Sequence, residues 1–186
     1  MPAPLTSPLP PPRDPGAPYR VCLVCLGNIC RSPMAETVLR AELAAAGLDG
    51  TVVVDSGGTG DWHVGDAMDP GARAALASRG LDGSDHRARQ FQPSWLERRD
   101  LILAMDERNL ADLRRMARGR DTSTQDADRI RLFGEVGGLT EAGGGNIPDP
   151  WGGDADEFGD VLDLLRTAAP VIAGRLARLL EPRGTQ

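Results

Sequence analysis

The sequence predicts an α/β fold, a single three-layer domain with a central four-stranded parallel sheet flanked by helices. Short apolar runs that suit strands alternate along the chain with segments that suit helices. The run L-I-L-A-M at 101–105 is apolar throughout, which is typical of a parallel strand buried on both faces. Strands that alternate with helices form right-handed βαβ units, so the four strands are expected to share one parallel sheet.

The first half of the chain supplies two strands and two helices. A short apolar run ends at Cys25, and Ser32 and Pro33 suit the N-cap and first turn of the helix that follows. β-branched residues at 51–54 indicate the second strand, and a long Gly-rich loop follows it. The expected elements are strands at 21–25 and 51–54, and helices at 33–46 and 71–79.

The second half begins with an irregular stretch at 86–91. A buried strand and an amphipathic helix follow, and a Gly-rich loop at 134–147 leads into a long helix in which Pro170 is a point of bending. The expected elements are a helical turn at 93–99, strands at 101–105 and 130–133, and helices at 106–118 and 155–181.

The proline distribution divides the chain into a tail and one domain. Residues 1–19 hold eight of the fifteen prolines and little apolar surface to bury, which predicts a disordered proline-rich tail. The tail lacks the apolar core of a signal peptide, and no stretch of the chain is long and apolar enough to cross a membrane. Residues 20–186 are then the folded domain, expected to be a monomer.

Charge and cysteine content narrow the possible partners and location. The net charge of −6 argues against nucleic acid or an anionic membrane as partner. Three cysteines crowd into residues 22–30, and both histidines lie far from them, so neither a disulfide framework nor a zinc site is predicted. We expect no metal and no cofactor. The cysteine pattern indicates a reducing compartment and hence the cytoplasm, although non-classical secretion leaves no mark in a sequence.

The stretch V-C-L-V-C-L-G-N-I-C-R-S-P-M-A at 21–35 carries the predicted chemistry. Cys25 ends a strand, Arg31 follows at a C-x5-R spacing, and a helix begins there. Loop N–H groups and a helix N-terminus form an anion cradle, in which a thiolate is stabilised. The same cradle holds a phosphate, with Arg31 as a planar bidentate donor. A nucleophile and an anion site in one loop are what thiol-based phosphate-ester chemistry needs.

Longer motifs carry a family resemblance. The string C-L-G-N-I-C-R-S-P-M-A-E resembles the signature of the low-molecular-weight protein tyrosine phosphatases, in their bacterial form. The resemblance covers residues 20–182 and includes S-G-G-T-G-D-W-H-V-G (56–65), H-R-A-R-Q (86–90), A-M-D-E-R-N (104–109) and D-P-W (149–151). It implies a phosphatase that hydrolyses phosphotyrosine in proteins through a cysteinyl-phosphate intermediate, and that binds phosphate or vanadate in the loop.

The resemblance also assigns the catalytic residues. Cys25 is the nucleophile, and Arg31 with the loop amides binds the phosphate. Asp149 lies between two prolines, and the residues alone leave open whether it is a general acid or part of an ordinary Asp-Pro turn. The family carries its general acid in a D-P-aromatic motif late in the chain, so the resemblance makes Asp149 the general acid and then the general base.

Binding and supporting residues follow by the same similarity. Ser32 is expected to hydrogen-bond the Cys25 thiolate, and Asn28 to hold the loop in a strained shape. The substrate-contacting set is Leu26, Gly27, Asn28, Ile29, Cys30, Trp62 and Trp151, and the buried network that supports Asn28 is Ser56, His86 and Asp106. The chain departs from the family in one respect: Gly152 and Gly153 follow Trp151, so a regulatory tyrosine is missing there.

Three alternatives compete with this interpretation. An arsenate reductase of the same fold passes a disulfide to cysteines further along the chain, and this chain has none after Cys30. A protein-arginine phosphatase of the same family carries Thr where Ile29 stands. A phosphotyrosine-binding module needs Arg31 and the loop but neither Cys25 nor Asp149. Cys30, five residues after Cys25, is either a small buried packing residue or a redox partner of the nucleophile.

Overall fold

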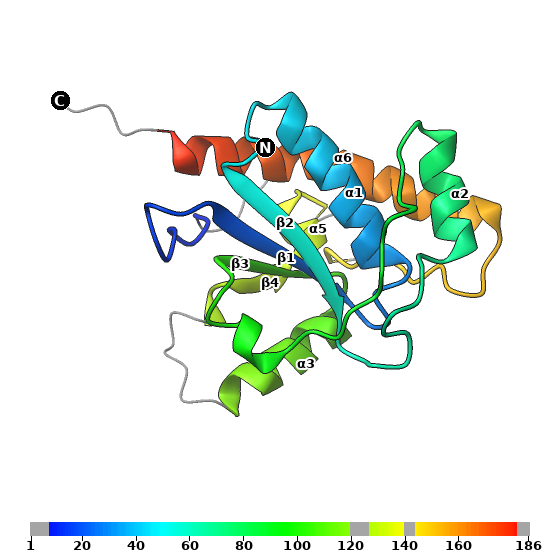
Figure 1. The fold of residues 1–186 in the computed structure, drawn as a ribbon, viewed down its shortest axis with the longest axis horizontal. Coiled ribbons are helices and arrows are strands. Elements are labelled where there is room, and N and C mark those ends of the chain that lie inside the picture. Colours follow the sequence, from blue (N-terminus) through cyan, green and yellow to red (C-terminus); the bar gives the residue numbers. More distant parts are fainter. Residues whose placement is uncertain (1–7, 120–126, 140–143, 182–186) are drawn as a thin grey trace.

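Four parallel strands form the central sheet, in the order β2-β1-β3-β4. A computed structural model of the chain describes residues 8–119, 127–139 and 144–181. The strands are β1 (Tyr19–Cys25), β2 (Val52–Gly58), β3 (Leu101–Ala104) and β4 (Ile130–Leu132) (Figure 1). The predicted parallel sheet is therefore confirmed, and β1 lies at its centre, where the order of the strands reverses.

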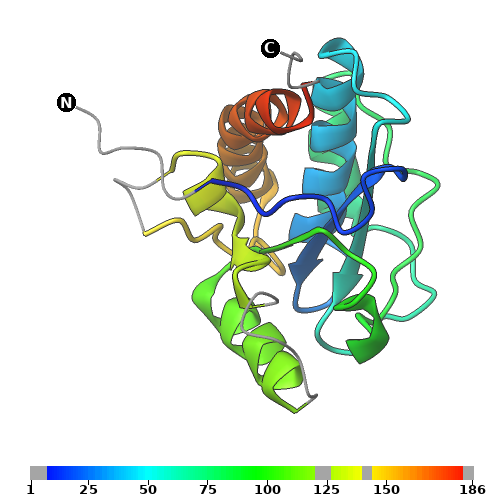
Figure 2. The ribbon, with the colours of Figure 1, turned by 90° about the vertical axis from the view of Figure 1, so that its left-hand side faces the viewer.

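Helices cover both faces of this sheet. The helices α1 and α6 pack together on one face, where α2 and α5 also contact α6, and α3 packs against β3 and β4 on the other face (Figures 1 and 2). The three predicted layers are confirmed. The helices are α1 (Arg31–Ala45), α2 (Pro70–Ser78), α3 (Glu107–Arg118), α5 (Phe133–Val136) and α6 (Ala155–Leu180), with a short 3-10 turn η1 (Pro93–Trp95).

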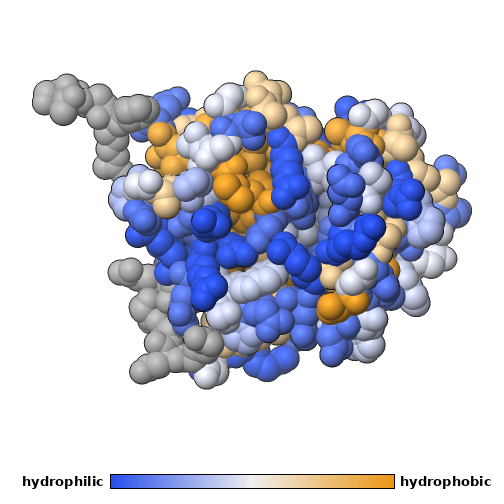
Figure 3. All heavy atoms as spheres, in the orientation of Figure 1, coloured by the Kyte–Doolittle hydropathy of each residue, from blue (hydrophilic) through white to orange (hydrophobic). Residues whose placement is uncertain are grey.

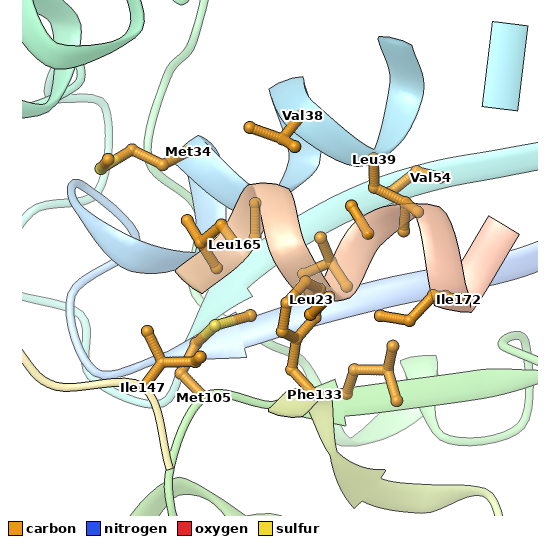
Figure 4. Close-up of a cluster of buried hydrophobic side chains, with 14 of the residues drawn as sticks. Leu23, Met34, Val38, Leu39, Val54, Met105, Phe133, Ile147, Leu165 and Ile172 are labelled. Atoms are coloured by element: carbon orange, nitrogen blue, oxygen red, sulfur yellow. The ribbon is translucent and has the colours of Figure 1, made fainter. Parts of the chain in front are cut away.

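Each central strand buries both of its faces. Leu23 of β1 joins the large apolar cluster under α1 and α6, which Figure 4 shows in close-up, whereas Val24 joins the smaller cluster beside α3. Leu103 and Ile102 of β3 divide between the clusters in the same way. Successive strand residues point to opposite faces, so an unbroken apolar run is needed when both faces are covered.

Aspartates cap three of the helices, but α1 begins differently. Asp69, Asp106 and Asp154 each accept a backbone N–H at the start of a helix, as N-cap side chains do. The predicted N-cap role of Ser32 is wrong, because α1 already begins at Arg31, and its N-cap residue makes no side-chain cap. Ser32 lies inside the first turn of α1, which leaves its hydroxyl for another partner.

Residues 8–18 differ from the predicted disordered tail. Leu9 is only 6% exposed, and the Tyr19 hydroxyl donates to the carbonyl oxygen of Pro10 at 2.9 Å. The prediction of disorder was based on proline content. That content carries no information on whether a single leucine is buried or whether proline carbonyls accept hydrogen bonds. Residues 1–7 of the predicted tail and residues 182–186 of the predicted domain lie outside the described residues.

The face of the molecule in Figure 3 is largely hydrophilic, with hydrophobic residues gathered in separate patches. Across the described residues no helix combines the length and the apolar character that a bilayer crossing requires.

Candidate active site

The loop that follows β1 lies at the carboxyl edge of the sheet, where open parallel sheets bind their ligands. We call residues 25–31 the Cys25 loop. Cys25 ends β1 and is 3% exposed. Gly58 of β2 allows this loop to pack closely, because a Cβ at Gly58 would lie only 2.7 Å from the carbonyl oxygen of Leu26. The second glycine of S-G-G-T-G therefore has a steric reason.

Asn28 fixes the shape of the Cys25 loop. It is the one non-glycine residue with a positive φ, 56°, among the described residues. Its side-chain amide donates to Ser32 Oγ and Ser56 Oγ, both at 2.9 Å, and its Oδ1 accepts the backbone N–H of Arg89 at 2.8 Å. Because asparagine tolerates the left-handed region and here makes three side-chain hydrogen bonds, the strained conformation is held firmly.

Two serine hydroxyls link Asn28 to the thiol and to helix α1. Ser32 Oγ lies 3.0 Å from Cys25 Sγ and already accepts from Asn28, so its own hydrogen is left for the sulfur or for the Gly57 carbonyl oxygen 3.4 Å away. The backbone N–H of Asn28 also donates to Cys25 Sγ at 3.3 Å. Ser56 accepts from Asn28 and donates to Glu36 Oε2 at 2.5 Å. The Ser32 hydroxyl and the Asn28 N–H thus both lie within hydrogen-bond distance of the sulfur.

His86 supports the loop from outside. Its Nε2 lies 2.7 Å from the carbonyl oxygen of Asn28, so that nitrogen carries the hydrogen. Burial lowers the pKa of His86 and outweighs the opposite effect of this hydrogen bond. The neutral imidazole is therefore the form that the folded protein holds at neutral pH.

Arg31 joins the Cys25 loop to two aspartates. Its Nη1 donates to Asp106 Oδ2 at 2.6 Å and its Nη2 to Asp149 Oδ2 at 2.8 Å, while the side chain is only 3% exposed. Its buried Nε is without an acceptor in the part of the chain that the structure describes. Burial alone would lower the pKa of Arg31, but a Cys25 thiolate and the two carboxylates outweigh burial and raise the pKa.

Asp106 has a different partner from the one the sequence predicts. The prediction assigns it to the network around Asn28, whereas the structure joins it to Arg31 and uses its other oxygen to cap α3 through the N–H of Asn109 at 2.7 Å. The physical reason is the position of Asp106 just after β3, next to the end of the loop at Arg31 and not next to its middle. The other two predicted supports, Ser56 and His86, do contact Asn28.

A cavity of about 310 Å³ opens above the Cys25 loop. Asp149 reaches it from the segment before α6, and its side chain is 42% exposed. Trp62 and Trp151 line it while remaining 71% and 66% exposed. The remaining lining residues are Cys25, Leu26, Gly27, Ile29, Cys30, Arg31 and His63. The structure thus brings the predicted catalytic and substrate-contacting residues to one place, apart from Asn28, which is fully buried beneath the loop.

The two other cysteines lie in different surroundings. Cys30 lines the cavity, belongs to the same apolar cluster as Cys25, and has a pKa raised by its burial. Cys22 lies in the cluster on the opposite face of the sheet, and burial raises its pKa too. Of the two, Cys30 is therefore the one on the same side as Cys25 Sγ.

The described residues contain no cluster of three or more His, Cys, Asp and Glu side chains that could hold a metal ion. Among the described residues that line the cavity are the Arg31 guanidinium and the Asp149 carboxylate, together with the Cys25 thiol; Asp106 holds Arg31 from outside this lining.

Comparison with known proteins identifies the family. The family model described as "Low molecular weight phosphotyrosine protein phosphatase" matches residues 20–181. The chain belongs to this family. A relative from Streptomyces coelicolor, named low molecular weight protein-tyrosine-phosphatase, is 44% identical over 165 residues, which cover 89% of this chain and 98% of the relative. The low-molecular-weight phosphatases are enzymes, so the expectation of an enzyme is confirmed.

Solved structures of the family share the fold. The crystal structure of YfkJ from Bacillus subtilis is 34% identical, with a TM-score of 0.76 over 88% of this chain and 97% of that one. A protein tyrosine phosphatase from Entamoeba histolytica, solved with Hepes in its active site, is 29% identical, with a TM-score of 0.77 over 86% of this chain and 97% of that one.

Sequence reasoning missed three residues of the site. His63 lines the cavity and lies against Gly27, where an added Cβ would be 3.0 Å from its ring. Its position next to Trp62 in the sequence could have indicated that it lines the same cavity. Glu36 lies one helical turn after Ser32 on α1, and this spacing could have suggested that both face the loop. Arg89 contributes its backbone N–H to Asn28 Oδ1 and its Nη2 to the Ser56 carbonyl oxygen at 3.0 Å. A contribution through a backbone N–H leaves no side-chain pattern in a sequence.

Proposed function

We propose that the protein hydrolyses phosphotyrosine in proteins, and aryl phosphate monoesters generally, through a phosphocysteine at Cys25. The observation that carries this proposal is the convergence of Cys25 Sγ, the Arg31 guanidinium and the Asp149 carboxylate on one cavity that two tryptophans flank. A binding module would need the guanidinium and the loop but neither the thiol nor the carboxylate, so the presence of both beside the guanidinium supports catalysis.

In the first step Cys25 attacks phosphorus. A sulfur–phosphorus bond forms, the bond from phosphorus to the aryl oxygen breaks, and Asp149 donates a proton to the departing oxygen. Tyrosine has a pKa of about 10, so protonation of its leaving oxygen lowers the barrier considerably. The hydrogen bonds from Ser32 and from the Asn28 N–H stabilise the thiolate before the attack.

In the second step water replaces sulfur on phosphorus. The Asp149 carboxylate takes a proton from water, an oxygen–phosphorus bond forms, and the sulfur–phosphorus bond breaks to release inorganic phosphate and the thiolate. Arg31 and the loop amides hold the phosphoryl oxygens in both steps. Such preorganised donors act mainly as electrostatic stabilisation of the transition state.

Arg31 must change partners when phosphate binds. Its Nη2 donates to Asp149 at 2.8 Å, while Asp106 holds Nη1 on the other side. A phosphate dianion competes with the Asp149 carboxylate for Nη2, because both are anions that need the same donor. Released from Arg31, Asp149 takes up a proton from solvent and donates it to the leaving oxygen, and Asp106 keeps the guanidinium oriented throughout.

The position of the nucleophile favours aryl esters. Cys25 is 3% exposed at the base of the cavity, so phosphorus must reach the sulfur at the end of a long side chain. Trp62, Trp151 and Ile29 offer apolar surface to a phenyl ring. Phosphoserine is shorter and lacks the ring, and we therefore expect poor hydrolysis of it.

Partners and location complete the proposal. The substrates are phosphotyrosine-containing proteins, and the enzyme works as a monomer. The dependence on a reduced Cys25 supports a cytoplasmic location, where thiols are kept reduced.

The test is turnover with purified protein. p-Nitrophenyl phosphate and a phosphotyrosine peptide should be hydrolysed at undiminished rates in the presence of EDTA, and orthovanadate should inhibit. A matched phosphoserine peptide should react far more slowly. Equal rates on the two peptides, or loss of activity with EDTA, would contradict the proposal.

A further inference from the structure

The end of the sheet opposite the active site binds the chain's own proline-rich segment. We call residues 8–13, P-L-P-P-P-R, the strap. A turn at 14–17, closed by the hydrogen bond from the Ala17 N–H to the Asp14 carbonyl at 3.1 Å, folds the strap back onto the start of β1. Figure 2 shows this blue segment crossing the side of the molecule where the strands begin.

The carbonyl oxygens of the strap are bound by side-chain donors from three places. Tyr19 donates to the Pro10 carbonyl at 2.9 Å. Arg129 Nη1 donates to the Pro11 carbonyl at 2.9 Å, and Arg131 Nη2 to the Pro8 carbonyl at 3.0 Å. Tyr19 is the first residue of β1, Arg129 directly precedes β4, and Arg131 lies within β4. Burial raises the pKa of Tyr19, so its hydroxyl remains a donor.

Proline explains why side chains make these bonds. A proline has no N–H and so cannot pair as a strand along the edge of the sheet. Its carbonyl oxygens remain strong acceptors, and aromatic and polar side chains recognise proline-rich segments through them. The strap also buries Leu9, which is 6% exposed and joins the main apolar cluster.

Arg13 anchors the other end of the strap. Its N–H donates to Asp100 Oδ1 at 2.6 Å, its Nε to the Arg99 carbonyl at 2.9 Å, and its Nη2 to the Leu96 carbonyl at 2.9 Å. Asp100, which directly precedes β3, is 5% exposed and also accepts the Arg20 N–H at 2.7 Å. This second hydrogen bond fixes its carboxylate in position. The domain thus binds both the proline-rich sequence and the arginine that follows it.

We propose that the surface where β1, β3 and β4 begin is a recognition site for proline-rich peptides with the chemistry of P-L-P-P-P-R, and that the strap fills this site in cis. The contacts belong to the strap itself and do not depend on the turn that links it to β1. The strap also precedes the match to the family model, which begins at residue 20. A covalently attached segment has an effective concentration in the millimolar range, so it excludes the same peptide in trans.

The experiment weakens the strap within the full chain. In the variant with Leu9→Ser and Arg13→Ala, the strap loses its apolar contact and two of its hydrogen bonds to the body of the domain. A fluorescently labelled peptide of residues 8–14 is added, and anisotropy is measured for this variant and for the wild type. Turnover of p-nitrophenyl phosphate, which should equal that of wild type, shows that the variant is folded.

The proposal expects saturable binding to the variant and at least tenfold weaker binding to the wild type. Adding Tyr19→Phe should weaken peptide binding about fivefold, the usual value of one hydrogen bond, and a peptide carrying Arg13→Ala should bind poorly. Equal binding by wild type and variant, or no binding to an active variant, overturns the proposal. If the double variant is inactive, the full chain with Arg13→Ala alone is measured against the same criteria.

Discussion

The two halves of the active site are built differently. In the Cys25 loop, Cys25 and Arg31 are 3% exposed, and Asn28 is fully buried with three side-chain hydrogen bonds. In the segment at 147–153, which we call the acid segment, Asp149 is 42% and Trp151 66% exposed. Asp149 there is joined to the site by its bond to Arg31 and accepts a local N–H from Trp151 at 3.2 Å.

This difference separates two chemical tasks. Phosphate binding needs donors fixed before the substrate arrives, because preorganisation is the source of their effect. An acid that later acts as a base must first lose its hydrogen bond to Arg31, which then binds the phosphate. It must next approach the leaving oxygen, and after that the attacking water. We therefore expect changes in the Cys25 loop to affect both chemistry and stability. Changes to the exposed side chains of the acid segment, Asp149 and Trp151, should affect chemistry alone, whereas Ile147 of that segment is 1% exposed and belongs to the core.

The largest effect is expected for Arg31→Lys. An ammonium cannot bind a phosphate through two parallel hydrogen bonds and cannot hold Asp106 at the same time. kcat/KM for p-nitrophenyl phosphate should fall roughly 10³–10⁵-fold, the range found for catalytic arginines in phosphoryl transfer. A fall of less than tenfold in a folded variant would show that loop amides suffice for phosphate binding.

Asp149→Ala comes next, with kcat lowered about 10²–10⁴-fold on phosphotyrosine. The deficit should shrink for aryl phosphates with more acidic leaving groups, which need no proton. Inorganic phosphate should bind this variant more tightly than wild type, because a competing carboxylate has gone from Arg31 Nη2. A deficit that is the same for every leaving group would remove Asp149 from the role of acid.

A matched pair of variants separates the two regions. Asn28→Ala removes three side-chain hydrogen bonds and leaves alanine at a φ of 56°, so kcat should fall up to about 10²-fold and Tm should drop. Trp151→Ala should raise KM for aryl phosphates while leaving Tm unchanged. If Trp151→Ala lowered Tm as much as Asn28→Ala does, the contrast between the regions would be lost.

Cys30→Ser should change the basal rate by less than about threefold, because a thiol with a raised pKa takes no part in phosphoryl transfer. Its effect should appear after peroxide. Wild type should recover with dithiothreitol, with a Cys25–Cys30 link in mass spectrometry, whereas the variant should stay inactive. A Cys22–Cys25 link is not expected, because those side chains lie on opposite faces of the sheet. Full recovery of the variant would leave Cys30 with a packing role.

His86 should give the smallest effect, a pH dependence of stability. Its folded-state pKa lies below the ordinary 6.5, so below about pH 6.5 the unfolded chain binds a proton that the folded chain does not. Stability therefore falls as the pH is lowered from 6.5 toward the folded-state pKa. His86→Gln, which can still donate to the Asn28 carbonyl, should show a shallower fall of Tm over this window. Parallel Tm curves for the two proteins would contradict this.

Local patterns were sufficient for the sheet and for the Cys25 loop, whereas the role of Asp149 follows only from the family resemblance. The apolar run of β3 needs no long-range information, and Cys25 and Arg31 occur in one continuous motif. The supporting contacts are different in kind. Asp106 was predicted beside the correct loop but given the wrong partner, since its choice between Asn28 and Arg31 depends on how that loop curls. Ser56 and Glu36 meet only after β2 has packed beside α1.

The strap shows the limit of composition. A proline-rich stretch with little apolar surface is expected to be disordered. Here one leucine, three proline carbonyls and one arginine meet partners from β1, the start of β3 and β4. Those partners are far away in sequence, so no local property of residues 8–13 could reveal them.

In the proposed mechanism Cys25 carries the phosphoryl group. The most direct measurement is rapid acid quenching of the enzyme during turnover of p-nitrophenyl phosphate, followed by mass spectrometry of the intact chain and its peptides, with Cys25→Ser as control. We predict one phosphoryl group, located on Cys25 and missing from the control. A phosphoryl group on another residue, or equal labelling of Cys25→Ser, would contradict the mechanism.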